Sequence, residues 1–178
     1  DNISFLSSTT TLSGEGEDDG EVKLGEGTDS FTLDAATYAG DVEAVAGTNT
    51  ISIQNQATFS GTYTGGADAD IFVISSDSAS SGLLNLGDGE NRVTVVGGNG
   101  TTLFTSSIVG GEDADVVRLQ TGARYGVEGD AGGSTVDLGE GDDSFTTGRD
   151  QVIFADVYLG RGDDTFTIGS PDSNATSV

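Results

Sequence analysis

The chain has 178 residues, with 29 glycines, no cysteine and no histidine. Its 30 acidic and 6 basic residues give a net charge of -24, which repels nucleic-acid phosphates and anionic lipids, so we expect no nucleic-acid partner and no membrane insertion. Without cysteine or histidine, disulfides and the usual zinc, copper and haem ligands are excluded. The carboxylates favour hard cations instead.

The N-terminal segment precedes a repeat that fills most of the chain. Residues 9–12, TTTL, could supply a first strand, and the acidic residues 13–20 its turn. The seven repeats are LGEGTDSFTL from Leu24, AVAGTNTISI from Ala44, GGADADIFVI from Gly65, LGDGENRVTV from Leu86, GGEDADVVRL from Gly110, LGEGDDSFTT from Leu138 and LGRGDDTFTI from Leu159. Their starts are 20, 21, 21, 24, 28 and 21 residues apart. Such small units must stack to bury apolar side chains, so the period predicts an all-β parallel β-solenoid (β-roll or β-helix) with rungs of about 21 residues.

Two strand registers recur within each rung. The eighth and tenth repeat positions are apolar and predict a strand with one buried face; they are Phe31 and Leu33, Ile51 and Ile53, Phe72 and Ile74, Val93 and Val95, Val117 and Leu119, and Phe145 with Thr147. A second inward register holds Tyr38, Phe59, Phe104, Tyr125 and Phe154, followed in several coils by Val42, Tyr63 and Ile108. Each rung therefore has two or three short strands. Helix is excluded because no segment has a 3.6-residue period.

Stacking brings the sixth repeat position into a column. The column contains Asp29, Asn49, Asp70, Asn91, Asp115, Asp143 and Asp164. At a spacing of about 4.8 Å, neighbouring charges repel by roughly 3.5 kcal/mol at an effective dielectric near 20. An Asp and Asn column can form Asx turns without a metal, but such turns leave the repulsion in place. Several calcium ions between the turns would neutralise it, and glycine leaves backbone carbonyls accessible as further ligands.

The turns resemble a known family. LGEGDDSFT and LGRGDDTFT match the pattern G-G-x-G-x-D-x-U-x of the RTX, or haemolysin-type, calcium-binding repeats at every position except the first. The resemblance implies a calcium turn followed by a strand, with side-chain ligands from Asp29, Asp70, Asp115, Asp143 and Asp164. The turn glycines of this set are Gly25, Gly27, Gly66, Gly87, Gly89, Gly111, Gly139, Gly141, Gly160 and Gly162.

This chain departs from the family pattern in three ways. One matching turn recurs per 21 or so residues instead of every nine, so we expect calcium along one edge only, in a coil with two or three sides. Asp68 and Asp113 replace the fourth-position glycine, which adds a ligand or distorts the turn. Asn49 and Asn91 are neutral, so we expect those levels to bind calcium weakly or to stay empty.

The whole pattern predicts one β-solenoid domain over residues 1–168, followed by a polar tail or linker at 169–178. The longest interval places a loop at 126–133, and we expect any export signal to lie outside this sequence. We expect a secreted, calcium-dependent structural protein of the extracellular space or bacterial cell surface. It would form an S-layer, filament or matrix by homo-oligomeric or end-to-end self-association.

Two other functions stay open from the sequence. One is an adhesin or a carbohydrate-binding or ligand-binding module. The other, less favoured, is a polysaccharide-active β-helix enzyme. We expect no enzyme because the chain lacks histidine and no motif interrupts the repeat to form a separate site.

Overall fold

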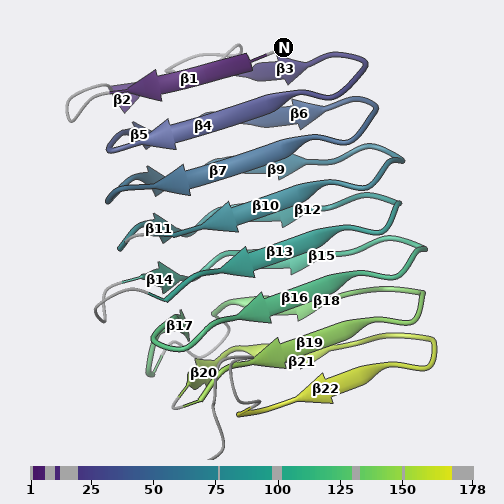
Figure 1. The fold of residues 1–178 in the computed structure, drawn as a ribbon. Helices are drawn as coiled ribbons and strands as arrows, with labels where there is room; N and C mark the ends of the chain where they lie inside the picture. Colours follow the sequence, from purple (N-terminus) through teal and green to yellow (C-terminus); the bar gives the residue numbers. More distant parts are fainter. Residues whose placement is uncertain are drawn as a thin grey trace, which may run out of the picture.

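The chain forms a parallel β-solenoid of about six turns in the computed structural model (Figure 1). The structure describes residues 2–6, 11–12, 20–75, 77–97, 102–129, 133–149 and 151–169. These residues contain strands and turns but no helix, and hence no helix that could cross a membrane. The solenoid predicted from the repeat period is confirmed.

Each coil contributes one strand to each of three parallel sheets. The first sheet contains β1 (Asn2–Leu6), β4 (Ser30–Asp34), β7 (Thr50–Gln54), β10 (Ile71–Ile74), β13 (Arg92–Val95), β16 (Val116–Leu119), β19 (Ser144–Thr147) and β22 (Thr165–Thr167), in that order. The second contains β2 (Thr11–Leu12), β5 (Thr37–Tyr38), β8 (Thr58–Phe59), β11 (Ala79–Ser80), β14 (Leu103–Phe104), β17 (Arg124–Gly126) and β20 (Val152–Phe154). The third contains β3 (Val22–Leu24), β6 (Val42–Ala44), β9 (Thr62–Thr64), β12 (Leu83–Asn85), β15 (Ser107–Val109), β18 (Thr135–Asp137) and β21 (Asp156–Tyr158). The coil is therefore three-sided.

The core lies inside the coil and follows the predicted alternation. In the first sheet, every side chain predicted to point inward is buried, from Phe31 and Leu33 on β4 to Phe145 and Thr147 on β19. Residues in the same position of successive coils pair directly, as Phe72 pairs with Ile51 and Val93. Vertical columns of like side chains therefore fill the interior.

The second sheet carries an aromatic column with two differences from the prediction. Tyr125 pairs with Ile153, while Phe154 pairs with Gly126, so the assignment of Phe154 to the inward register is wrong by one residue. Side chains alternate along a strand, which gives the inward position to Ile153. Ser80 on β11 interrupts the column, and its buried hydroxyl lies 2.7 Å from that of Ser106.

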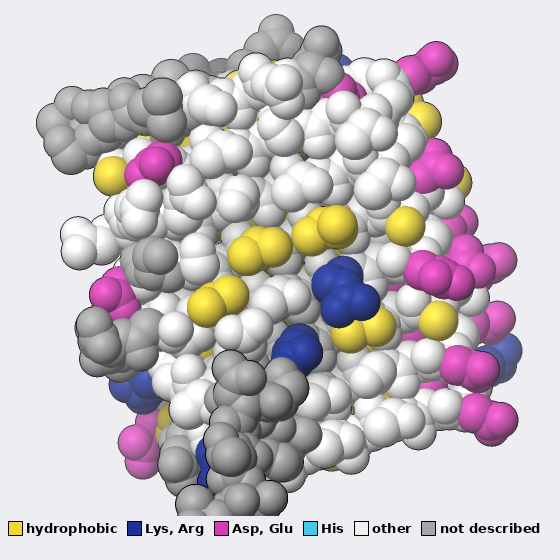
Figure 2. All heavy atoms as spheres, viewed as in Figure 1, with side chains coloured by type: hydrophobic (Ala, Val, Ile, Leu, Met, Phe, Trp, Pro, Cys, Tyr) yellow, Lys and Arg dark blue, Asp and Glu magenta, His cyan; other side chains and the backbone are white. Residues whose placement is uncertain are grey.

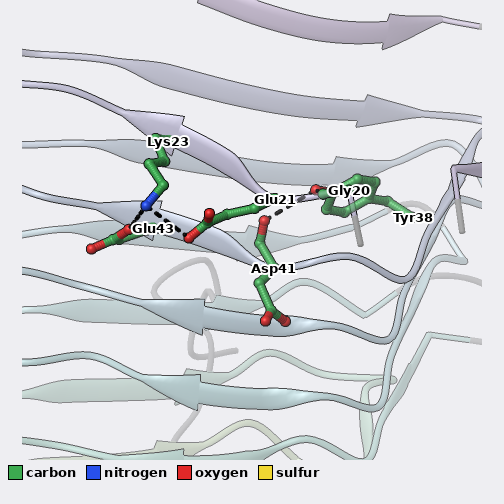
Figure 3. A network of polar contacts seen from close by, with 6 residues as sticks. All are labelled: Gly20, Glu21, Lys23, Tyr38, Asp41 and Glu43. Atoms are coloured by element: carbon green, nitrogen blue, oxygen red, sulfur yellow. Dashed lines mark hydrogen bonds and ion pairs between the residues drawn. The ribbon is translucent and has the colours of Figure 1, made fainter. Parts of the chain in front are cut away.

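The first coils are joined by polar contacts at the N-terminal end (Figure 3). Lys23 on β3 forms ion pairs with Glu21 at 3.2 Å and with Glu43 on β6 at 3.0 Å. These side chains are exposed, so the ion pairs add little stability. The buried Tyr38 hydroxyl donates a hydrogen bond to the Gly20 carbonyl oxygen and thereby joins β5 to the segment that precedes β3.

Several predicted segments lie wholly or partly outside the described residues. The N-terminal strand is present as Thr11–Leu12, while all but Gly20 of its predicted turn lies outside. In the predicted loop at 126–133, Gly126 ends β17, residues 127–129 follow it, and 130–132 lie outside. The predicted tail lies outside except for Gly169.

Candidate metal centre

All seven predicted repeat turns stack at one corner of the solenoid. Each turn connects a strand of the third sheet to the next strand of the first, beginning with β3 to β4 and ending with β21 to β22. In Figure 2, acidic side chains gather along the right edge, where these turns lie in Figure 1. The structure therefore brings the predicted site residues together along one edge.

The sixth-position side chains lie inside this corner. From Asp29 to Asp143 they are at most 4% exposed, and Asp164 on the last coil is half-buried. Burial of a carboxylate is unfavourable unless its oxygens have partners. The hydrogen bonds of each level therefore determine what the column can bind.

One hydrogen bond recurs between all seven levels. From Asn49 to Asp164, the Oδ1 atom of each side chain accepts the backbone N–H of the equivalent residue one coil earlier. The bonds run from Asp29 N to Asn49 (3.2 Å), Asn49 N to Asp70 (2.8 Å), Asp70 N to Asn91 (2.8 Å), Asn91 N to Asp115 (3.0 Å), Asp115 N to Asp143 (2.7 Å) and Asp143 N to Asp164 (3.0 Å). Asp and Asn are interchangeable in this ladder because both carry an Oδ1 acceptor.

At the Asn levels, the side-chain amide occupies the interior of the turn. Asn91 Nδ2 lies 3.3 Å from the Gly87 carbonyl oxygen, 3.2 Å from that of Asp88 and 2.9 Å from that of Gly89. Asn49 Nδ2 donates to the Gly47 carbonyl oxygen at 2.7 Å. Three backbone oxygens thus converge on the positively polarised amide of Asn91, and one contacts that of Asn49.

Asp70 has hydrogen-bond partners on both of its carboxylate oxygens. Its Oδ1 accepts from the backbone N–H and from Nδ2 of Asn49, and its Oδ2 accepts from the Tyr63 hydroxyl at 2.5 Å. Burial raises the pKa of Asp70, while the bonds from Tyr63 and Asn49 oppose that rise. This pair was not predicted from the sequence, where Tyr63 was assigned only to the core.

Asp115 and Asp143 differ from the three levels that precede them, Asn49, Asp70 and Asn91. Each uses Oδ1 in the ladder, and each has a buried Oδ2 with no hydrogen-bond partner among the described residues. Burial raises the pKa of Asp115 to about 7, although hydrogen bonds from Asn91 act in the opposite direction. Burial also raises the pKa of Asp143. A cation or a proton at this Oδ2 atom would neutralise each carboxylate.

The backbone of the turns depends on glycine at the second and fourth positions. Gly87 and Gly89 have φ values of 76° and 89°, and Gly139 and Gly141 have 91° and 115°. The turns that hold Asn91 and Asp143 therefore share a left-handed pattern that favours glycine. Of the other predicted turn glycines, Gly27, Gly160 and Gly162 also have positive φ, whereas Gly25, Gly66 and Gly111 do not.

The fourth-position aspartates act on the outside of the corner. Asp68 and Asp113 are exposed and have no positive φ, so their turns differ from those with glycine at this position. Asp68 Oδ2 accepts the backbone N–H of Gly47 at 2.7 Å, and Asp113 Oδ2 accepts that of Gly89 at 3.1 Å. Each carboxylate therefore caps the turn of the preceding coil.

The donor set of the column suits calcium better than a transition metal. Among the described residues, no group of three or more acidic side chains is placed to hold a metal ion together. An ion here would combine one or two carboxylates with backbone carbonyl oxygens, which calcium accepts in flexible sets of six to eight. Magnesium demands a stricter octahedron and keeps its waters. The unpartnered Oδ2 atoms of Asp115 and Asp143 are the side-chain atoms that fit such an ion.

The geometry defines the class of protein as a three-sided parallel β-solenoid with a buried Asp and Asn column. No protein-family model matches the chain, and no significant match is found among curated proteins or solved structures. The resemblance to RTX repeats therefore rests on the repeated turn sequence, and membership of that family stays a prediction.

We expect Gly160→Ala to destabilise the solenoid by about 2 kcal/mol, measured by urea denaturation. An added Cβ would lie 1.8 Å from the Gly139 carbonyl oxygen, and the φ of +101° disfavours alanine. Gly25→Ala is the matched control, because its Cβ would meet nothing within 4 Å and should change the stability by less than about 0.5 kcal/mol. Equal effects of the two substitutions would contradict this packing of backbone on backbone.

Proposed function

We propose that this chain is an extracellular structural module of the RTX type, in which calcium completes the solenoid and permits self-association. The observation that carries the proposal is the pair of buried carboxylate oxygens on Asp115 and Asp143 that lack a hydrogen-bond partner in the part of the chain that the structure describes. A buried charge without a partner opposes folding, and a divalent cation in the turn reverses this effect. Several ions along one edge would also reduce the repulsion that accompanies a net charge of -24.

Dependence on calcium makes folding dependent on the compartment. Extracellular calcium modules need dissociation constants of only about 10⁻⁴ to 10⁻³ M. Metal binding that completes a fold adds directly to its stability, so the coils that bind calcium would stay loose in the calcium-poor cytosol and become ordered after export. This supports a secreted or cell-surface location.

Self-association is proposed for the ends of the solenoid. On the last coil, Tyr158 is 58%, Phe166 46% and Ile168 66% exposed. Among the described strands, β22 ends the first sheet, so its outer edge offers backbone groups to another strand. A second copy stacked end to end would cover both features, and repetition of this contact gives a filament or layer.

The proposal is tested on the full chain by circular dichroism and electron microscopy with calcium, with magnesium or with a chelator. We expect the strand signal to weaken in chelator, to recover with calcium and to recover less with magnesium. Fibres or sheets should form only with calcium. A strand signal and a melting temperature that do not respond to calcium would contradict the calcium dependence, and a monodisperse monomer at high concentration would contradict the assembly.

A further inference from the structure

Two turns of the column have the same pattern of positive φ values but differ in the side-chain group that they enclose. The turns of Asn91 and Asp143 both have positive φ at their second and fourth positions. Both side chains use Oδ1 in the same ladder and are 1% exposed. They differ at the second side-chain atom. In Asn91 it is an amide nitrogen in contact with three carbonyl oxygens, and in Asp143 it is an oxygen with no hydrogen-bond partner among the described residues.

We propose that the amide nitrogens of Asn49 and Asn91 stand in for the cation that the Asp levels require. The solenoid is then divided into a self-supporting segment, β7 to β13, and a cation-dependent segment, β16 to β22. This inference rests on the calcium binding proposed above, and it specifies which levels take an ion and which do not.

The level between the two asparagines supports the division. Asp70 receives two hydrogen bonds from Asn49 and one from Tyr63, so both of its carboxylate oxygens are partnered. Three consecutive levels, Asn49, Asp70 and Asn91, are therefore complete without an ion. At the next two levels, Asp115 and Asp143, the buried Oδ2 atoms lack a hydrogen-bond partner among the described residues.

The division also connects calcium to assembly. The coil with exposed Tyr158 and Phe166 lies at the cation-dependent end of the solenoid (Figure 1). Calcium would order this end and present its apolar surface and strand edge, while the self-supporting segment stays folded throughout. Calcium thus acts on the association surface locally, and unfolding of the whole molecule is not required.

Hydrogen exchange of the full chain, in chelator and in calcium, tests the division directly. We expect the amides of β7, β10 and β13 to exchange at similar rates in both conditions. The amides of β16, β19 and β22 should exchange at least about tenfold faster in chelator. A uniform change over all six strands would overturn the inference, and so would equal protection of all six in a protein that binds calcium.

Two reciprocal variants test the role of the amide. Asp143→Asn should raise the melting temperature in chelator by about 5 °C and remove about one bound calcium, measured by calorimetric titration. Asn91→Asp should lower the melting temperature in chelator, recover in calcium and bind about one more ion. The controls, Asp137→Asn and Asn85→Asp, make the same chemical changes away from the column and should leave both readouts unchanged.

The outcomes separate this inference from the proposed function. If the wild-type chain binds no calcium, the proposed function fails, although Asp143→Asn would still stabilise the metal-free protein. If the chain binds calcium but neither reciprocal variant changes the melting temperature in chelator or the number of bound ions, the amide does not replace the cation and the inference fails. Should Asn91→Asp not fold, Asp143→Asn and the exchange pattern still decide.

Discussion

Replacing Phe72 by alanine will destabilise the solenoid by about 4 kcal/mol, measured by urea denaturation. The Phe72 side chain is 1% exposed, and its ring centroid lies 6.0 Å from that of Phe59 and 5.7 Å from that of Tyr63. Alanine would leave a cavity in the middle of the aromatic core, where strands above and below prevent the walls from closing.

A matched control exists in the same column of the first sheet. Phe166 on β22 is stacked on Phe145 at a centroid distance of 5.3 Å but is 46% exposed. We expect Phe166→Ala to cost less than about 1 kcal/mol in dilute solution, because solvent already reaches this ring. Equal costs for the two substitutions would contradict a core whose stability depends on burial between coils.

Replacing Tyr63 by phenylalanine will cost about 3 kcal/mol, which is large for the loss of a single oxygen atom. The Tyr63 hydroxyl donates to the buried Oδ2 of Asp70, and without it this carboxylate would be left without a donor on that side. Thermal and urea unfolding give the loss of stability. Both are measured in chelator, so that calcium cannot replace the hydroxyl as the partner of Asp70.

Tyr125→Phe is the control for this prediction. The Tyr125 hydroxyl is also buried, but it donates to a neutral acceptor, the Ser106 carbonyl oxygen, at 3.1 Å. Removing a hydrogen bond to a neutral group costs about 1 kcal/mol. If the two phenylalanine variants are equally stable, the charge on Asp70 does not determine the cost.

The sequence predicts the fold because seven repeats bury their apolar side chains in the same way. Alternation such as Phe31 and Leu33 defines a buried strand face, and a spacing near 21 residues places equivalent strands side by side. The exact register is less secure where neighbouring residues are all apolar. In the all-apolar segment VIF, the sequence therefore does not show that Ile153, and not Phe154, takes the inward position.

The sequence also predicts which side chains form the column, but not how their atoms are used. That Oδ1 of each level accepts a backbone N–H from the preceding coil depends on the direction of the turn, which composition does not reveal. One sequence signal does point to the partner of Asp70. Tyr63 carries a hydroxyl at an inward position where the neighbouring coils have the aliphatic residues Val42, Leu84 and Ile108. The calcium ion itself stays a prediction.

The ladder of side-chain oxygens has one direction along the whole chain. A turn amide that has just been buried, such as that of Asp115, finds its acceptor only when Asp143 arrives one coil later. In this ladder, the turn amide of each coil is therefore bonded by the side chain of the coil that follows it. In a polypeptide that emerges N-terminus first, only the turn amide of the newest coil would lack its side-chain acceptor, until the next coil folds onto it.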